Sequence, residues 1–444
     1  MQSWQEFFSG KRITVIGMGL LGGNEDISFL ARAGAHLTVT DLKSEAELAP
    51  SLEKLGQFSD IRYTLGRHDF SDFEEADLVI QAPATPKDSP YILRARERGI
   101  PITMWAGLFA RFARAQQVPI IGVTGTRGKT TVTAMLRDIC SGAGRRVIEG
   151  GNIPGSSILS KLPELSKGST VLLELDSWKL QGFREEHLSP SIAVFTSFYP
   201  DHLNYYGGDM DAYLADKAEI FLHQGPKDTL VIGEQASDLI LKNYSDRIRA
   251  RRAIASSADL PQDLRLRVLG EHNRDNAACA LAAGRAMEIP DSEILRALRE
   301  FAGVPGRLEF LREWKGVKIY NDTTATTPTA TMAGLEALDP EGKRSILLIM
   351  GGADKELPLE GLAEAAKVHC KKIFLLAGSG TERIKSQFAQ SPVYLSLAEA
   401  FRAATEAATS GESVVLSPAF ASFGMFKNEY DRGAQFKTLA ENLK

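Results

Sequence analysis

The residues with the clearest capacity for chemistry lie in one stretch, IIGVTGTRGKTTVTAML, over residues 120–136. An apolar β-branched run passes into a glycine-rich segment and then a helical pattern, which predicts a strand, a phosphate-binding loop and a helix. The glycines let backbone N–H groups surround a phosphate, and the helix N-terminus adds its positive dipole end. Lys129 can reach β- and γ-phosphate oxygens, and the Thr130 hydroxyl can ligate Mg²⁺. The predicted loop contacts are Gly125, Thr126, Arg127, Gly128, Lys129, Thr130 and Thr131.

A competing interpretation of this stretch is a glycine-rich turn with an incidental lysine. The full Walker spacing would require glycine at position 123, where the chain has Val123. The shorter form TGTRGKTT nevertheless follows a strand pattern and precedes a helix pattern, as a phosphate loop must. The agreement of the three signals favours the phosphate loop.

More polar residues follow strand patterns further along the chain. STVLLELDSW predicts a strand whose end carries Glu174 and Asp176, and SIAVFTSFYPDHL predicts another that runs into His202. Carboxylates at the carboxyl end of a parallel strand beside a phosphate loop are suited to Mg²⁺. A helix containing Lys217 comes next. A lone histidine at a strand end is often only a cap, but its place in a row of such polar groups favours a functional role.

The N-terminal region has the pattern of a nucleotide-binding unit. RITVIG predicts a strand, Gly17 to Gly22 a glycine turn, NEDISFLARAG a helix, and HLTVTD a second strand that ends at Asp41. An acidic side chain at that point can accept a hydrogen bond from a ribose or a base. G-x-G-x-x-G alone is a weak signal, so the turn could serve a redox dinucleotide or another nucleotide moiety.

Alternating strand and helix patterns continue to the C-terminus, with Pro305 and Gly306 marking a linker. The chain is therefore predicted to be an α/β protein of three domains. We expect a Rossmann-like domain over residues 1–105, a phosphate-loop domain with a parallel or mixed sheet over 106–303, and a second Rossmann-like domain with an open parallel sheet over 304–444.

Composition limits the classes of function. The 444 residues are 43% hydrophobic and 24% charged, and the net charge is −4, which gives no basic field for nucleic acid. Cys140, Cys279 and Cys370 have no metal-binding or paired spacing and are predicted to be buried thiols. No signal peptide and no membrane-spanning run is recognisable. We expect a cytoplasmic monomer that binds neither nucleic acid nor membrane.

Taken together, these motifs resemble the Mur ligases, which form amide bonds with ATP in peptidoglycan precursor synthesis. The resemblance covers nearly the whole chain and rests on TGTRGKTT, LLELDSW, YPDHLNYYGGDMDAYLADKAEIF, GEHNRDN, PGRLEF, YNDTTATTPTAT, MGGADKE and LSPAFASFGMFKNEYDRGAQF. The YNDTTATTP segment and the last of these segments are most similar to the type that adds D-glutamate to UDP-N-acetylmuramoyl-L-alanine. That reaction proceeds through an acyl phosphate.

The resemblance also implies roles for individual residues. Lys129, Glu174, His202 and Lys217 would be catalytic; Thr130 and Glu174 would hold one Mg²⁺, and His202 with Lys217, commonly carbamylated in the family, a second. Beyond the loop, the implied ATP contacts are Asn276, Arg307 and Asp322. The UDP-linked substrate would contact Leu20, Leu21, Asp41, Lys43, Asn152, Asp176 and Lys179. The incoming amino acid would contact Thr326, Lys355 and Ser422.

The chain departs from the usual family motifs at several positions. Arg127 replaces an asparagine, Thr324 a lysine, Asp176 a serine, Lys179 a glutamine, and Glu429 an aromatic residue. Most of these positions face the acceptor or the amino acid, so L-glutamate or a different amino acid is also a candidate substrate. Two rival functions are a non-catalytic nucleotide-binding relative and a nicotinamide-dependent redox enzyme. The redox enzyme would leave the phosphate loop and the third domain without a role.

Overall fold

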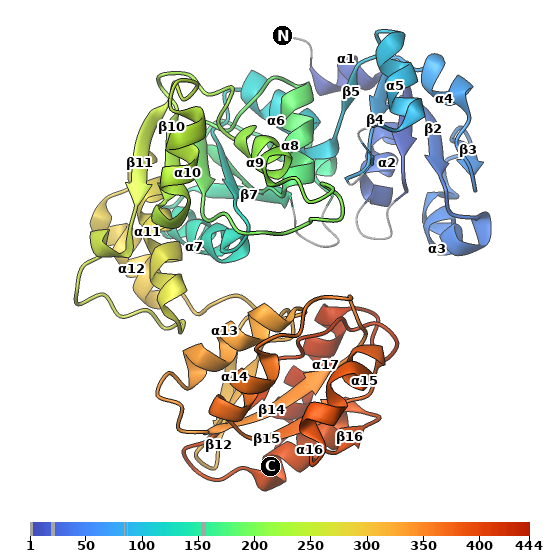
Figure 1. Cartoon of the computed structure of the whole chain (residues 1–444). Helices are drawn as coiled ribbons and strands as arrows, with labels where there is room; N and C mark the ends of the chain where they lie inside the picture. Colours follow the sequence, from blue (N-terminus) through green and yellow to red (C-terminus); the bar gives the residue numbers. More distant parts are fainter. Residues whose placement is uncertain (1–2, 19–22, 84, 87, 152–156) are drawn as a thin grey trace. The chain divides into compact units, whose positions relative to one another are not determined.

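The computed structural model describes residues 3–18, 23–83, 85–86, 88–151 and 157–444. Within them the chain forms three sheets with helices packed on their faces, which confirms the predicted α/β fold (Figure 1). The chain divides into two compact units. The first comprises Met1–Leu264 and Asp275–Leu298, and the second comprises Arg265–Arg274 and Arg299–Lys444. The domain boundaries at 105 and 303 remain predictions.

The first sheet has five parallel strands in the order β3-β2-β1-β4-β5. The strands are β1 (Arg12–Ile16), β2 (His36–Asp41), β3 (Arg62–Leu65), β4 (Leu78–Ile80) and β5 (Ile102–Thr103). The helices are α1 (Trp4–Phe8), α2 (Gly23–Arg32), α3 (Glu45–Leu55), α4 (Phe70–Glu74) and α5 (Pro90–Glu97). The strand order reverses between β1 and β4, and in such sheets ligands bind at the carboxyl ends of the strands beside that point.

The second sheet has six parallel strands in the order β11-β10-β9-β6-β8-β7. They are β6 (Ile120–Thr124), β7 (Arg146–Gly151), β8 (Ser169–Glu174), β9 (Ile192–Phe195), β10 (Thr229–Gly233) and β11 (Arg251–Ala255). The associated helices are α6 (Trp105–Ala115), α7 (Lys129–Gly142), η1 (Leu159–Glu164), α8 (Ser177–Glu185), α9 (Met210–Ala218), α10 (Glu234–Tyr244), η2 (Ser257–Asp259), α11 (Glu271–Ala286) and α12 (Asp291–Glu300). β6 and β8 are neighbours and buried along their whole length, so the residues that follow them lie at one edge of the sheet.

The first two sheets share one hydrophobic core. Phe8 of α1 packs against Phe112 of α6 with ring centroids 5.6 Å apart. α6 also approaches α8 closely, because a Cβ atom on Gly107 would lie 2.4 Å from the carbonyl oxygen of Gly182. One continuous cluster contains buried apolar residues from both sheets. This shared core explains why the first two predicted domains make up a single compact unit.

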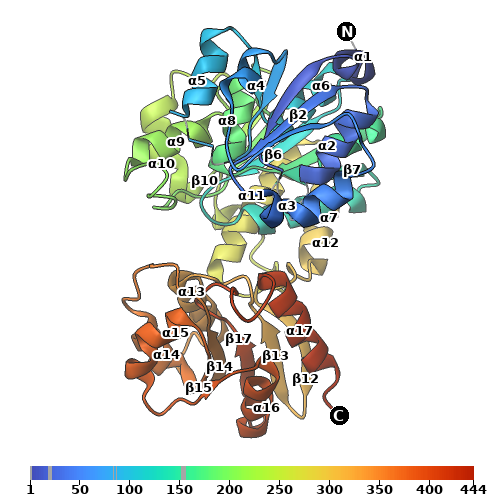
Figure 2. The ribbon, with the colours of Figure 1, turned by 90° about the vertical axis from the view of Figure 1, so that its right-hand side faces the viewer.

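The third sheet has the strand order β12-β13-β17-β14-β15-β16. Its strands are β12 (Glu309–Trp314), β13 (Val317–Asn321), β14 (Ile346–Gly351), β15 (Cys370–Leu376), β16 (Val393–Tyr394) and β17 (Ser413–Leu416). Its helices are α13 (Pro328–Leu338), α14 (Leu362–His369), α15 (Ser379–Ile384), η3 (Lys385–Phe388), α16 (Leu397–Ala407) and α17 (Glu429–Glu441). Along β14, Leu348 and Met350 pack towards α13, α14 and α15, whereas Leu347 and Ile349 pack towards α16 and α17 (Figure 2).

The prediction of an all-parallel third sheet was wrong. β12 pairs with β13 in antiparallel orientation, so the sheet is mixed. The two strands are joined by Lys315 and Gly316, both at positive φ, which is the geometry of a tight hairpin. β12 is only partly buried, and its sequence therefore lacks the continuous apolar run by which the other strands were recognised.

The three cysteines are buried free thiols, as predicted. In the part of the chain that the structure describes, no helix combines the length and apolarity needed to cross a membrane.

Candidate active site

The phosphate loop joins β6 to α7 and depends on two glycines. Gly125 and Gly128 have φ values of +140° and +86°, where other residues are strained. A Cβ atom on Gly125 would lie 2.0 Å from Thr196 Oγ1, and one on Gly128 would lie 2.3 Å from Asn276 Oδ1. Both positions therefore require glycine, and Asn276, one of the predicted ATP contacts, lies directly against the loop.

Two side chains at the start of α7 are already engaged. Lys129 Nζ donates hydrogen bonds to the carbonyl oxygens of Gly125, at 2.9 Å, and Thr126, at 3.0 Å. Thr130 Oγ1 donates to Glu174 Oε1 at 3.0 Å, and Glu174 is buried at the end of β8. The loop thus brings an ammonium group, a hydroxyl and a carboxylate to the carboxyl edge of the second sheet.

The remaining loop residues lie beside β9. The N–H of Thr126 donates to the carbonyl oxygen of Ser197 at 2.7 Å, and that of Arg127 donates to Ser197 Oγ at 3.0 Å. The Arg127 guanidinium lies 5.3 Å from the centre of the Tyr199 ring, a cation–π distance. Thr131 follows in the first turn of α7. Arg127 thus packs against an aromatic ring.

Lys217 is a buried lysine of α9 that points to the same loop. Its Nζ donates to the carbonyl oxygen of Gly125 at 2.8 Å, and only 1% of the residue is exposed. Burial lowers the pKa of Lys217 well below its usual value, and the charge of Lys129 adds to this shift. Asp176 and Asp201 oppose it. The shift favours the uncharged amine, which is the nucleophilic form of lysine.

The buried Asp176 and the half-buried Lys179 form an ion pair beside this cluster. Asp176 is the N-cap of α8; its Oδ1 accepts the Lys179 N–H at 2.8 Å and its Oδ2 accepts Lys179 Nζ at 3.0 Å. Burial pushes the Asp176 pKa upward, but the charge and hydrogen bonds of Lys179 outweigh it and lower the pKa. The charge of Lys129 also lowers it, which shows that the pair lies near the phosphate loop.

His202 follows β9 and packs between aromatic rings. Its imidazole lies 4.5 Å from the centre of Trp178 and 6.0 Å from that of Tyr213. Burial lowers the pKa of His202; Asp201 opposes the shift, and the charges of Lys217 and Lys129 add to it. A neutral imidazole next to the lysine cluster is the form of histidine that ligates metals.

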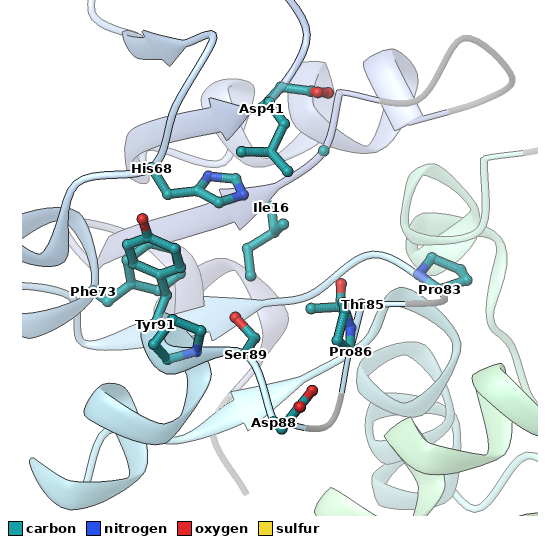
Figure 3. Close-up of a pocket in the computed structure, with 13 residues that line it drawn as sticks. Ile16, Asp41, His68, Phe73, Pro83, Thr85, Pro86, Asp88, Ser89 and Tyr91 are labelled. Carbon is teal, nitrogen blue, oxygen red and sulfur yellow. The ribbon is translucent and has the colours of Figure 1, made fainter. Parts of the chain in front are cut away.

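The first sheet carries a separate cavity of about 520 Å³ at the carboxyl ends of its strands. Asp41 lies at its edge, where its Oδ2 accepts the Met18 N–H and its Oδ1 the Lys43 N–H, each at 3.0 Å. Figure 3 shows His68, Phe73 and Tyr91 gathered at one end of the cavity and Pro83 and Thr85 at the other. Asp41 and Lys43 are thus at the predicted nucleotide-binding edge. Leu20, Leu21 and Asn152 lie outside the described residues.

The aromatic wall of this cavity was not predicted. The rings of His68 and Tyr91 are 5.1 Å apart, and those of Phe73 and Tyr91 are 5.3 Å apart. His68 Nδ1 is 2.6 Å from Thr40 Oγ1, which fixes the orientation of the imidazole. These residues come from the loops and helices after β3 and β4, and no local pattern marks them. Flat rings of this kind suit the face of a nucleobase.

Two predicted ATP contacts belong to the second unit. Asp322 follows β13 and is 6% exposed; its Oδ1 accepts the Leu308 N–H at 3.0 Å and its Oδ2 accepts the Ser417 hydroxyl at 2.7 Å. Burial raises the pKa of Asp322 to about 7, and the Ser417 and Leu308 hydrogen bonds and the charge of Arg307 oppose that shift. Asp322 therefore links the turn that contains Arg307 and Leu308 to Ser417, the residue after β17.

The predicted amino-acid contacts also lie in this unit. Lys355 is exposed, and its Nζ donates to Thr326 Oγ1 at 2.8 Å. Ser422 is buried, and its carbonyl oxygen accepts the N–H of Phe426 at 3.2 Å. The structure therefore joins Lys355 to Thr326 directly, and their contact with an amino acid stays a prediction.

Arg432 is the largest fully buried side chain among the described residues and was missed at the sequence level. Its guanidinium donates to Thr323 Oγ1 at 3.1 Å, to the Thr323 carbonyl at 2.8 Å and to the Phe420 carbonyl at 3.4 Å. It thereby links the two loops that carry Thr326 and Ser422. Glu429 is half-buried in the first turn of α17, where its carbonyl oxygen accepts the Thr323 hydroxyl at 2.8 Å. An arginine in the sequence does not itself indicate burial.

The residues around the phosphate loop fit a nucleotide with Mg²⁺. Thr130 and Glu174 meet in a hydrogen bond and would supply two hard oxygen donors of the kind that Mg²⁺ takes from protein beside a nucleotide phosphate. Among the described residues, no group of three His, Cys, Asp or Glu side chains could hold a metal.

Comparison with known proteins gives matches along the chain. The N-terminal domain of MurD-like Mur ligases matches residues 11–104, the Mur ligase middle domain residues 123–284, and the Mur ligase glutamate ligase domain residues 306–420. A UDP-N-acetylmuramoylalanine–D-glutamate ligase of Roseiflexus sp. is 35% identical, with 98% of this chain and 99% of that protein covered. The ligase of the same name from Borreliella burgdorferi is 34% identical, with 97% of each covered.

The fold has also been seen in solved structures. The crystal structure of UDP-N-acetylmuramate–alanine ligase MurC from Thermotoga maritima is 20% identical, covers 98% of this chain and 100% of its own, and has a TM-score of 0.60. At that identity the likeness concerns the fold alone. Three consecutive domain matches and full-length relatives above 30% identity agree with the phosphate loop and the three sheets. The chain belongs to the Mur ligase family and has the MurD-like form of its N-terminal domain.

Proposed function

We propose that this protein adds D-glutamate to UDP-N-acetylmuramoyl-L-alanine at the expense of ATP, in peptidoglycan precursor synthesis. The observation that carries the proposal is the cluster at the second sheet, where Lys129, the Thr130–Glu174 pair and the buried Lys217 surround one phosphate loop. The names of the full-length relatives support the choice of substrates. An NAD-dependent redox enzyme would have no use for this loop.

The reaction requires activation of a carboxylate, which is a poor acyl donor. The γ-phosphoryl group of ATP passes to the alanyl carboxylate, ADP leaves, and the resulting acyl phosphate is attacked by the amine of glutamate. Inorganic phosphate is then expelled, and the amine loses a proton as the amide forms. Lys129 neutralises charge on the transferring phosphoryl oxygens, and Asn276 and Arg307 hold the nucleotide.

Thr130 and Glu174 would hold one Mg²⁺, and His202 and Lys217 a second. The metal ions supply charge compensation for the phosphoryl group. Lys217 would serve as a carbamate: its neutral amine attacks CO₂, an N–C bond forms and a proton is released. Its burial and lowered pKa support this modification, because a charged ammonium group would not react.

The three domains divide the work in this proposal. The cavity of the first sheet holds the uridine, with Asp41 and Lys43 at its edge. Leu20 and Leu21 would contact the uridine and the diphosphate, and Asn152 the sugar. Asp176 and Lys179 face the muramoyl-alanine end. The C-terminal domain presents Lys355, Thr326 and Ser422 to glutamate. We expect the enzyme to act as a monomer, since each role falls within a single chain.

Phosphate release measured with each substrate omitted in turn tests the proposal. Fast release is expected only when ATP, UDP-N-acetylmuramoyl-L-alanine and D-glutamate are all present. Equal release without the acceptor or without the amino acid would contradict the proposed ligase.

A second candidate keeps the chemistry and changes the amino acid. Glu429 stands half-buried in the first turn of α17, and Thr324 replaces the lysine usual in the family. The added carboxylate of Glu429 and the missing lysine ammonium at Thr324 would both disfavour a substrate that carries a second acidic group. A neutral or basic amino acid as the preferred substrate would establish this candidate.

A further inference from the structure

A buried carboxylate next to Lys217 has no role in the reaction described so far. Asp216 lies in α9 and is 0% exposed. One oxygen of its carboxylate, Oδ1, accepts a hydrogen bond from the Arg184 guanidinium. The other, Oδ2, accepts hydrogen bonds from Gln181 Nε2 at 2.8 Å and from the Tyr206 hydroxyl at 3.0 Å. Three side chains thus converge on one residue of α9.

This network ties α9 to α8, which lies beside it (Figure 1). Gln181 and Arg184 belong to α8, and Arg184 also donates to Glu219 Oε1 at 2.7 Å, just after α9 ends. α8 is itself held in place by α6, because a Cβ atom on Gly107 would lie only 2.4 Å from the Gly182 carbonyl oxygen. α8 is therefore a fixed reference against which the network places α9.

Hydrogen bonds to a carboxylate fix a helix more narrowly than apolar contacts do. Each hydrogen bond has a preferred distance and direction, whereas apolar attraction has no direction and tolerates sliding and rotation. A buried carboxylate is costly unless its hydrogen bonds are made, so a small rotation of α9 would leave Asp216 unsatisfied. The network therefore favours one rotation and one height of α9 relative to α8.

The placement of α9 decides where the amine of Lys217 lies. Successive residues of a helix point about 100° apart, so Asp216 can face α8 while Lys217 faces the phosphate loop. Lys217 Nζ donates to the Gly125 carbonyl oxygen at 2.8 Å and lies 4.8 Å from the centre of the Tyr213 ring. These contacts hold only the end of a long and flexible side chain. A shift of α9 would draw the amine away from the loop.

We propose that Asp216 is a positioning residue, which sets α9 against α8 so that the carbamate of Lys217 forms at the phosphate loop. The inference rests on the proposed function. The carbamate arises when the neutral amine attacks CO₂: an N–C bond forms, one electron pair of a C–O double bond moves to oxygen, and the nitrogen loses a proton to water. Because the reaction is reversible, a displaced Lys217 should hold less carbamate at a given CO₂ concentration.

Asp216→Leu tests this inference, because leucine fills the buried site and accepts no hydrogen bond. The kcat should fall by about tenfold or more, since small displacements at a reaction centre are costly, while the KM for ATP and for the acceptor should stay within about twofold. Added bicarbonate, which supplies CO₂, should restore part of the activity. The wild type should not respond to bicarbonate. Lys217→Ala has no amine to modify and should not respond either.

The carbamate can also be measured without turnover. After addition of isotopically labelled bicarbonate, carbon NMR of the wild type should show a carbamate signal that is lost in Lys217→Ala. Asp216→Leu should show a weaker signal at the same CO₂ concentration, and more bicarbonate should bring it towards that of the wild type. An equal signal in the wild type and Asp216→Leu would overturn the inference.

Asp339→Leu is the matched control, because it makes the same substitution at another buried carboxylate. Asp339 accepts the backbone N–H groups of Lys343 and Arg344 at 3.0 Å each, but it lies in the second unit. This variant should lose stability without any response of its activity to bicarbonate. A response equal to that of Asp216→Leu would overturn the inference, because the response would then follow from lost stability alone.

Tyr206→Phe keeps the test decisive if Asp216→Leu does not fold, because it retains the ring and removes a single hydrogen bond. It should lower kcat less than Asp216→Leu and should weaken the carbamate signal. Its effect should shrink in an Asp216→Asn background, since both substitutions act on one carboxylate. Full additivity, or an unchanged carbamate signal in Tyr206→Phe, would contradict the inference.

The inference and the proposed function fail in different ways. Phosphate release by the wild type that ignores the acceptor or glutamate would contradict the proposed function. Release that requires all three substrates, together with a carbamate signal that is absent from the wild type or equal in Asp216→Leu, would contradict the inference and leave the ligase standing.

Discussion

The phosphate-loop region and the predicted amino-acid region differ in how far their side chains are held before a substrate arrives. Around the loop, Lys129 and Lys217 are fixed by backbone carbonyls, and Thr130 is fixed by Glu174. In the C-terminal unit, Lys355 is the cation among the predicted amino-acid contacts, and it is exposed and bonded to Thr326. The first region is preorganised in a low-dielectric setting, where charges act strongly. In the second region, the predicted contact for the amino acid is Lys355, an exposed side chain whose charge is screened by solvent.

This difference separates reaction class from substrate choice. Changes at the loop should abolish chemistry with every amino acid, because charge compensation during phosphoryl transfer is common to all of them. Changes in the C-terminal unit should alter the KM for the amino acid and leave phosphoryl transfer intact. Variants of the two regions should therefore differ in whether they lower kcat or raise the KM for the amino acid.

Lys129→Ala should have the largest effect. Loss of its ammonium leaves the phosphoryl oxygens uncompensated, and kcat should fall by about 10³-fold or more. Phosphate release under saturating substrates measures this. Lys242→Ala, on the exposed side of α10, serves as the control and should be fully active. A near-normal kcat for Lys129→Ala would remove the loop from the mechanism.

Lys217→Ala should be the next most severe change. If the side chain acts as a carbamate, its loss removes a carboxylate ligand, and kcat should fall by about 10²-fold. Added acetate or formate should restore part of the activity, because either supplies a short carboxylate. Lys129→Ala should not respond to acetate. Failure of rescue, together with an unmodified Lys217 in the mass spectrum of the native protein, would speak against the carbamate.

Lys355→Ala should change substrate binding rather than chemistry. Two glutamate carboxylates enter the site, and loss of a cationic partner should raise the KM for glutamate by about tenfold or more. The KM values for ATP and the UDP-linked acceptor should change little. Thr326→Ala and Ser422→Ala should produce smaller increases of the same kind. A fall in kcat with an unchanged KM for glutamate would show that Lys355 acts in the chemical step and not in binding glutamate.

The pH dependence of stability should reveal the buried carboxyl of the second unit. The folded pKa of Asp322 is about 7, above its usual 3.8, so the folded chain binds more protons than the unfolded chain between these values. Its contribution to stability is therefore present at low pH and is lost as pH rises towards 7. Asp322→Asn should flatten the curve of melting temperature between about pH 4 and 7. An unchanged slope would indicate that the carboxyl titrates normally.

Glu429→Phe should have the smallest effect. If the Glu429 carboxylate faces the amino acid, its removal relieves repulsion of a γ-carboxylate, and glutamate use should improve or stay the same. The ratio kcat/KM for D-glutamate measures this. If the wild type prefers a neutral or basic amino acid and Glu429→Phe destroys that preference, the assignment to glutamate is wrong although the ligase chemistry remains.

The sequence predicted those parts of the site that depend on local order. Glu174 ends β8, and Thr130 follows β6 after the phosphate loop. Adjacent parallel strands end at the same edge of a sheet, so the meeting of these two residues could be expected. The fold class followed in the same way from alternating strand and helix patterns. Even so, the antiparallel edge strand β12 was missed, because its half-exposed sequence lacks an apolar run.

The parts that could not be predicted depend on packing between distant segments. Asp26 meets Ser157 across 131 residues, and Arg432 meets Thr323 across 109. No spacing rule connects such pairs, and a buried charge in a sequence looks like a surface charge. The pairing of Asp176 with Lys179 was open to prediction, since i,i+3 residues are neighbours on a helix, but it required knowing that α8 begins at Ser177.

The most direct test of the proposed function is a panel of amino acids in the phosphate-release assay, with ATP and UDP-N-acetylmuramoyl-L-alanine saturating. D-glutamate should give by far the highest kcat/KM, with L-glutamate, D-aspartate and neutral D-amino acids near background, and the product should contain a new amide bond. A higher kcat/KM for any other amino acid would contradict the assignment of D-glutamate. Phosphate release that is independent of every amino acid would contradict the ligase itself.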